Sequence, residues 1–154
     1  IGKVKAIQIK AVCELAKRIS NPIDKQKIKV KTPQDVSNLV MSELKLEKRE
    51  IVEVIILNSQ NVVIKIQNRS HGGTNSANVD PKDLFAEAIK LGAPKIIMVH
   101  NHPSGNSMPS QQDIEFTEKM DQASEILGIQ LLDHIVIGYN EYTSIKSYLL
   151  KGRN

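Results

Sequence analysis

The sequence predicts an α/β or α+β fold in which helices flank a mixed β-sheet. Short runs of β-branched residues alternate along the chain with longer segments whose apolar residues recur at helical spacing. Two of these runs, 50–58 and 61–68, are separated only by Ser59-Gln60, which predicts a hairpin and therefore an antiparallel pair within the sheet. The 154 residues are enough for one domain with a real core.

Two helices are predicted ahead of the hairpin. Residues 4–19 show helical apolar spacing, and the residues that show it are Val4, Ile7, Ala11, Leu15 and Ile19. Residues 21–31 interrupt this helix and are expected to form an extended basic linker. Thr32-Pro33 supplies an N-cap and a first-turn proline for a second helix that runs to about Leu46.

The middle of the chain is predicted to contain a loop, a third helix and a buried strand. Residues 70–78 are rich in glycine and serine and are expected to be a loop. Asp80-Pro81 begins the third helix, which ends near Leu91-Gly92. Residues 95–100 form a short apolar run, interpreted as a strand that ends at His100.

The last third of the chain is predicted to add a fourth helix and another strand. Ser110 begins this helix and Gly128 ends it. Its expected core contacts are Ile114, Met120, Ala123 and Leu127. Residues 130–138 are predicted to be a strand, and the tail from Tyr142 a short strand and helix.

The composition is that of an ordinary globular protein, with 40% apolar and 25% charged residues. No apolar run approaches the ~20 residues that a membrane span needs, and no signal-peptide pattern opens the chain. The single cysteine, Cys13, excludes an internal disulfide and fits a reducing cytosol, so a cytoplasmic protein is expected. Cys13 is interpreted as a small buried side chain rather than a reactive thiol. The chain begins with Ile1 rather than Met, which fits a piece of a longer protein.

The net charge of +4 is unevenly distributed. Residues 1–31 carry nine Lys/Arg against Glu14 and Asp24, a balance of +7, and the other 123 residues carry twelve basic and fifteen acidic side chains, a balance of −3. Such a basic arm can contact nucleic acid weakly. A solvated face and linker is favoured, because no aromatic residues are interleaved with the lysines.

The segment HNHPSGNSMPSQQD, residues 100–113, carries the strongest candidate site. His100 and His102 point the same way from an extended chain, at the end of the predicted strand. A compact Pro/Gly turn then leads to Ser110, and Asp113 falls in the first turn of the next helix. Two imidazoles and one carboxylate suit Zn²⁺ with a fourth position open for water. The simpler alternative is that Ser110 and Asp113 only form a capping box, and these observations leave both interpretations open.

This segment resembles a known motif at every spacing. His100-x-His102, seven residues, Ser110, two residues and Asp113 resemble the JAMM motif of the MPN/JAB metalloprotease superfamily. Together with LGIQLLDHIVIG (127–138), the segment closely resembles the bacterial RadC family. The resemblance implies an MPN/JAB-like, cytidine-deaminase-like core over 32–154. Residues 1–31 would then be the end of a helix-hairpin-helix segment followed by the basic linker.

The resemblance also implies roles for individual residues. His100, His102 and Asp113 would hold Zn²⁺, and Ser110 would donate a hydrogen bond to an oxyanion. The superfamily uses an upstream glutamate as general acid/base, and Glu50 in KREIVEVIIL is the best positional match.

Four further residues near these motifs have side chains that could contribute to a site. Glu53 is the fallback for Glu50, since a one-residue error in strand register would reverse the two faces. His71 lies in the glycine-rich loop and is favoured as a plain exposed histidine. Asp133 and His134 point to opposite faces of their strand; a structural role is favoured, with orientation of a metal ligand as the alternative.

The resulting hypothesis is a zinc-dependent hydrolase of JAMM type, acting on a peptide or isopeptide bond of an unidentified substrate. A metal-dependent nuclease is the first alternative, suggested by the basic arm and by the repair-related name of the family. A non-catalytic binding module is the second, since many superfamily members have lost the metal. The complete ligand set favours the hydrolase.

Overall fold

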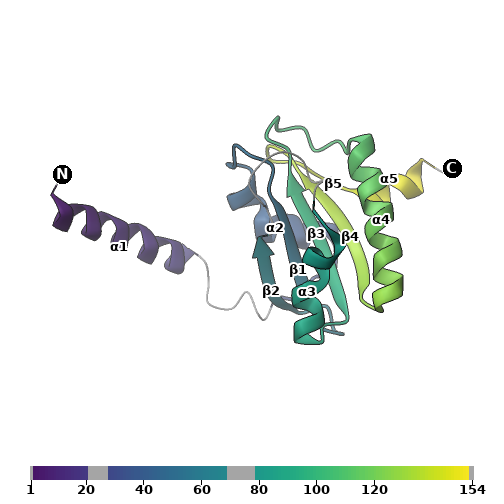
Figure 1. Cartoon of the computed structure of the whole chain (residues 1–154). Coiled ribbons are helices and arrows are strands. Elements are labelled where there is room, and N and C mark those ends of the chain that lie inside the picture. The colour runs from purple at the N-terminus through teal and green to yellow at the C-terminus, as the bar shows by residue number, and fades with distance from the viewer. Residues whose placement is uncertain (1, 21–27, 69–78, 153–154) are drawn as a thin grey trace.

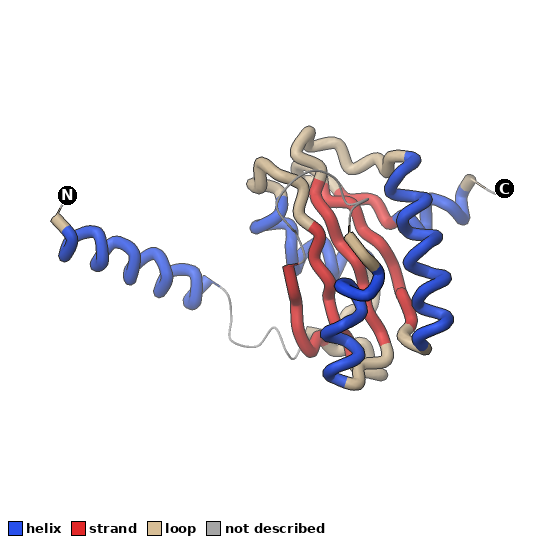
Figure 2. The backbone as a smooth tube through the Cα atoms, in the orientation of Figure 1, coloured by secondary structure: helices blue, strands red, loops and turns tan. Residues whose placement is uncertain are grey.

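The computed structural model describes residues 2–20, 28–68 and 79–152. Its centre is one five-stranded sheet in the order β2-β1-β3-β4-β5 (Figures 1 and 2). The strands are β1 (Val52–Leu57), β2 (Val63–Asn68), β3 (Lys95–Asn101), β4 (Gln130–Ile137) and β5 (Tyr142–Ser144). The β3–β4 pair is parallel and the other three pairs are antiparallel. The mixed sheet and the hairpin of β1 and β2 confirm the predicted fold class.

Helices cover both faces of this sheet (Figure 1). The helices are α1 (Lys3–Ser20), α2 (Pro33–Leu44), α3 (Pro81–Leu91), α4 (Gln111–Leu127) and α5 (Ile145–Lys151). One apolar cluster joins α3 and α4 to the sheet through Phe85, Phe116 and Met120. The second joins α2 to the opposite face through Val36 and Val40. Residues of β1 and β3 contribute alternately to the two clusters, as the period of two in a strand requires.

The helix boundaries follow from the capping residues that the sequence contains. Thr32 caps α2, and its side chain accepts from the backbone nitrogen of Asp35. Asp80 caps α3 and Ser110 caps α4. At the other ends, Gly92 and Gly128 adopt φ of 62° and 66°, which glycine tolerates without strain. Helix α2 ends two residues earlier than predicted, at Leu44.

Two predictions about burial are wrong. Cys13 is exposed, because none of the described side chains of α1 is buried against the body; Val4 and Ile7 are among the exposed ones. Leu127 is 42% exposed at the end of α4, whereas Phe116, which was not predicted, is buried in the core. Residues ahead of α2 also pack against the body: Val30 is buried in the α2-side cluster. In the described residues, no helix has the length and apolar character needed to cross a membrane.

The sheet places the candidate site at the end of its central strand. Strand β3 lies between β1 and β4, and His100 is the second-last residue of β3. His100 pairs with Val52, whose side chain belongs to the cluster under α3 and α4. The same face therefore receives His100 and the first turn of α4.

Candidate metal centre

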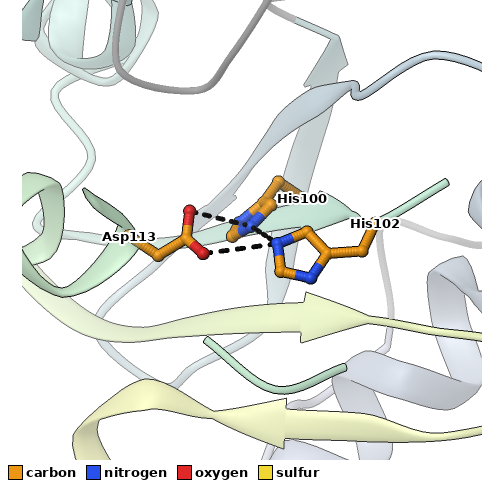
Figure 3. A group of neighbouring side chains, drawn as sticks. All are labelled: His100, His102 and Asp113. Atoms are coloured by element: carbon orange, nitrogen blue, oxygen red, sulfur yellow. Dashed lines mark hydrogen bonds and ion pairs between the residues drawn. The ribbon is translucent and has the colours of Figure 1, made fainter. Parts of the chain in front are cut away.

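Three side chains from β3, the following turn and α4 converge on one point (Figure 3). The Nε2 atoms of His100 and His102 lie 3.1 Å apart. Asp113 directs one carboxylate oxygen to each histidine, with Oδ1 3.2 Å from His100 Nε2 and Oδ2 3.3 Å from His102 Nε2. Within the described residues, this is the only group of three or more potential metal ligands.

The donor set and its spacing fit a zinc ion. In a tetrahedral zinc site with bonds of roughly 2.0–2.1 Å, neighbouring ligand atoms lie about 3.3 Å apart. The two nitrogens, 3.1 Å apart, are close to that spacing, and each has a different oxygen of the Asp113 carboxylate nearby, Oδ1 at 3.2 Å from His100 and Oδ2 at 3.3 Å from His102. Two imidazoles and a carboxylate leave a fourth position for water or substrate, which is the pattern of catalytic rather than structural zinc sites.

The turn after β3 fixes the orientation of His102. Its backbone nitrogen donates to the Ile137 carbonyl at 2.9 Å, which continues the pairing with β4. Its ring Nδ1 lies 2.9 Å from the Asn106 carbonyl oxygen. A carbonyl only accepts, so Nδ1 carries the proton and Nε2 faces the other two side chains.

The N-terminus of α4 fixes the orientation of Asp113. Ser110 Oγ accepts from the Asp113 backbone nitrogen at 3.1 Å, and Asp113 Oδ2 accepts from the Ser110 backbone nitrogen at 2.7 Å. Both halves of a capping box are therefore present. The capping box and the convergence on the histidines are compatible, because the carboxylate that caps the helix also places Oδ1 3.2 Å from His100 Nε2 and Oδ2 3.3 Å from His102 Nε2 (Figure 3).

The electrostatics of the three side chains are compatible with a bound cation. Burial alone would raise the pKa of the Asp113 carboxyl, but its interactions with the neighbouring imidazoles of His100 and His102 and with Ser110 outweigh burial and hold that pKa far below its usual range. The hydrogen bond to Asp113 likewise raises the pKa of His102, against the opposite effect of burial. The Asn106 carbonyl, the Asp113 charge and the Glu50 charge add to the rise. An ionised carboxylate facing two ring nitrogens thus favours a positive charge between them.

Glu50 lies within electrostatic reach of His102. It is half-buried just ahead of β1, and its carboxylate is near enough to His102 to raise the pKa of that imidazole. Its carboxylate therefore contributes to the negative potential around the three converging side chains.

Glu53 lies on the face of the sheet opposite to His100. It pairs with Val99, whose side chain belongs to the cluster under α2. Its neighbours in β1, Val52 and Val54, belong to the cluster under α3 and α4. The alternation of a strand therefore turns Glu53 away from the histidines.

Two residues behind His100 complete a buried polar network. His134 on β4 is fully buried, and its Nε2 lies 2.7 Å from His100 Nδ1. Its Nδ1 lies 2.7 Å from Thr117 Oγ1 on α4. Burial lowers the pKa of His134 well below its usual value, so the ring is neutral. Thr117 was not among the predicted site residues, although it follows Asp113 by four residues and therefore shares a helix face with it.

Asp133, the neighbour of His134, forms hydrogen bonds with the backbone of β4 and α5. Its carboxylate accepts from the backbone nitrogen of His134 at 2.8 Å and from that of Lys146 at 3.4 Å. Burial raises the pKa of Asp133, against the effect of these hydrogen bonds. The residue ties β4 to the start of α5. His71, the other histidine considered, lies outside the described residues.

Asn101, between the two histidines, holds the segment that carries Glu50. It is 1% exposed, and its Oδ1 accepts from the Ile51 backbone nitrogen at 2.7 Å. Its Nδ2 donates to the backbone oxygens of Glu47 and Arg49, at 3.3 and 3.0 Å. Its amide therefore bonds to backbone groups on both sides of Glu50. The sequence analysis assigned no role to this position.

Comparison with known proteins agrees with this geometry. Residues 30–150 match the family described as the RadC-like JAB domain. The chain is 45% identical over 146 residues to a UPF0758 protein of Clostridium botulinum strain Hall, across 95% of this chain and 64% of that relative. A UPF0758 protein of Alkaliphilus metalliredigens strain QYMF is also 45% identical over 146 residues, across 95% of this chain and 63% of the relative. The chain thus spans less than two thirds of the length of these relatives, and it belongs to the family of the RadC-like JAB domain.

Proposed function

We propose that this chain is a zinc-dependent hydrolase of JAMM type that cleaves a peptide or isopeptide bond. The observation that supports the proposal is the convergence of His100, His102 and Asp113, with both imidazole Nε2 atoms turned toward the carboxylate. The half-buried carboxylate of Glu50 beside His102 adds the acid/base group that amide hydrolysis needs.

The role proposed for each residue follows from its position. His100, His102 and Asp113 would hold the ion, which when bound supplies Lewis acidity and lowers the pKa of a coordinated water to roughly 7. Glu50 accepts a proton from the attacking water and passes it to the leaving amine. A basic nitrogen leaves readily only after it has received such a proton.

Ser110 is the proposed hydrogen-bond donor to the oxygen of the scissile carbonyl. Its hydroxyl donates to Asp113 Oδ2 at 2.7 Å and accepts from the Asp113 backbone nitrogen at 3.1 Å. The hydroxyl proton must therefore turn from Asp113 toward the substrate as negative charge develops on that oxygen. The capping interaction through the backbone nitrogen survives this rotation, since it uses a lone pair of Ser110 Oγ.

Metal analysis of the purified chain tests the proposal. We expect about one Zn²⁺ per chain, and we expect His100→Ala and Asp113→Ala each to abolish zinc binding at neutral pH, because either change removes a ligand. Asp121→Ala is the matched control: Asp121 lies on the same helix and forms an ion pair with Lys146 at 2.8 Å. It should keep its zinc. Stoichiometric zinc in the His100→Ala/Asp113→Ala double variant would place the metal elsewhere and contradict the proposal.

A further inference from the structure

The hydrogen bonds behind a metal-binding histidine decide which ring nitrogen is free for the metal. A neutral imidazole has one N–H, and only its other nitrogen has a lone pair to offer. For His102 the Asn106 carbonyl decides, because it can only accept from Nδ1–H. At His100 the neighbour of Nδ1 is another imidazole nitrogen, Nε2 of His134, at 2.7 Å. Either ring is able to donate in that pair, so the direction must be decided by a third group.

Thr117 is that third group. Its Oγ1 lies 2.6 Å from the backbone oxygen of Asp113 and 2.7 Å from Nδ1 of His134. The hydroxyl has one proton, and at 2.6 Å the carbonyl oxygen would repel the hydroxyl oxygen unless it received that proton. Thr117 therefore donates to Asp113 and accepts from His134. His134 then carries its single proton on Nδ1 and offers the lone pair of Nε2 to His100.

We propose that Thr117 and His134 are positioning residues that hold His100 in the tautomer protonated at Nδ1, with the lone pair of Nε2 turned toward the metal site. The series of hydrogen bonds from the Asp113 carbonyl through Thr117 and His134 to His100 is called the relay below. The relay is buried along its length: Thr117 is 2% exposed, and His134 and His100 are 0% exposed. Water therefore has little access to replace any of its members. It begins at one proposed zinc ligand, Asp113, and ends at another.

The reversed relay would be incompatible with a metal. If His134 donated from Nε2, His100 would carry its proton on its own Nε2, aimed at the His102 nitrogen 3.1 Å away. That proton would occupy the space in which the ligand atoms converge. The inference rests on the proposed metal site and deepens it, because it assigns the residues that keep the lone pair of His100 Nε2 available to a cation.

Zinc affinity of two Thr117 variants tests the relay. Thr117→Val keeps the shape of the side chain but removes the hydroxyl, and Thr117→Ser keeps the hydroxyl. Zinc affinity, measured by competition with a chromophoric chelator, should fall about 10- to 100-fold in Thr117→Val, as for other partners of metal-binding histidines. Thr117→Ser should bind like the unchanged chain. Ser124→Ala controls for loss of a buried hydroxyl on the same helix, since Ser124 Oγ donates to the Asp121 carbonyl away from the site.

Nitrogen NMR of the histidine rings in the metal-free chain provides the second test, which does not depend on zinc. Long-range proton–nitrogen correlations should show His100 and His134 protonated at Nδ1 in the unchanged chain and in Thr117→Ser. In Thr117→Val, His100 should populate the other tautomer. His100 protonated at Nε2 in the unchanged chain, or full zinc affinity in Thr117→Val, would overturn the relay. If Thr117→Val does not fold, the spectrum of the unchanged chain decides alone.

The two tests separate the relay from the proposed function. A chain that has both Nδ1 protons but binds no zinc keeps the relay and contradicts the hydrolase. A chain that binds zinc equally with valine or serine at position 117 keeps the metal site and contradicts the relay.

Discussion

The acid/base step of the proposed hydrolysis depends on one carboxylate, that of Glu50. Glu50 is half-buried just ahead of β1, and its charge is near enough to His102 to raise the pKa of that imidazole. We predict that Glu50→Gln keeps its fold and its capacity to bind zinc, because the role proposed for Glu50 is to accept a proton and not to bind the metal. Hydrolysis should be lost, by a factor of about 10² or more. Cleavage of a peptide library followed by mass spectrometry, with metal content measured in parallel, is the experiment.

Glu53→Gln is the matched control for that prediction. Its side chain lies on the face of the sheet opposite to His100 and is 9% exposed. The substitution should leave cleavage rates unchanged in the fraction that folds. Equal activity in Glu50→Gln and the unchanged chain would remove Glu50 from the mechanism. Loss of zinc in Glu50→Gln would make it a ligand instead.

At the residue scale, a site whose residues are close in sequence is predictable from the sequence, whereas a contact between distant segments is not. His100, His102 and Asp113 lie within fourteen residues, so the strand period and a helix first turn are enough to bring them together. His134 is 34 residues from His100, and only the parallel pairing of β3 and β4 brings them into contact. Which of Asp133 and His134 faces the site depends on a register shift between Ile96 and Ile97. No single-sequence period predicts such a shift.

At the scale of elements, Asn101 joins β3 to the segment that enters β1. We predict that Asn101→Ala lowers the free energy of unfolding by about 1–3 kcal/mol, because three part-buried backbone groups lose their hydrogen-bond partner. The Ile51 amide, whose acceptor is Asn101 Oδ1, should also exchange its hydrogen faster. Chemical denaturation and hydrogen exchange measure the two effects.

Asn38→Ala is the control for the Asn101 substitution. Asn38 accepts a hydrogen bond from Gln34 on the exposed face of α2. Its removal should change stability by less than about 0.5 kcal/mol. An Asn101→Ala variant as stable as Asn38→Ala would mean that water satisfies the backbone groups around Glu50.

Element boundaries were predictable because capping chemistry is local. Thr32, Asp80, Ser110, Gly92 and Gly128 each mark a helix end in the sequence and in the structure. Burial was less predictable. The apolar side chains at Val4, Ile7 and Leu15 have helical spacing, yet they remain exposed. Periodicity predicts that a helix has an apolar face but does not say against what that face packs.

At the scale of the whole molecule, the excess of positive charge lies in the N-terminal part of the chain, and the packed core lies in the part that follows. The body that packs around the sheet includes Val30. Residues 1–31 carry a balance of +7 and the remainder −3. The lysines of α1 are exposed where the structure describes them, as at Lys3, Lys5 and Lys10. These three lysines therefore lie on a helix none of whose described side chains packs against the sheet (Figure 1).

This distribution predicts weak, salt-sensitive binding to DNA that is independent of the metal centre. Lysines neutralise phosphates without reading bases, so the dissociation constant should be about 10⁻⁴–10⁻⁶ M with little sequence preference. The triple variant Lys3→Gln/Lys5→Gln/Lys10→Gln should bind more weakly, and its affinity should depend less on salt, because fewer counterions are released. Changing Lys82, Lys90 and Lys119 on the body to Gln removes the same number of charges and is the control. Fluorescence anisotropy over a series of salt concentrations measures both. DNA binding that stays tight at high salt, or that is lost when zinc is removed, would indicate that the metal centre takes part in DNA binding. Either result would favour a nuclease over the peptide hydrolase.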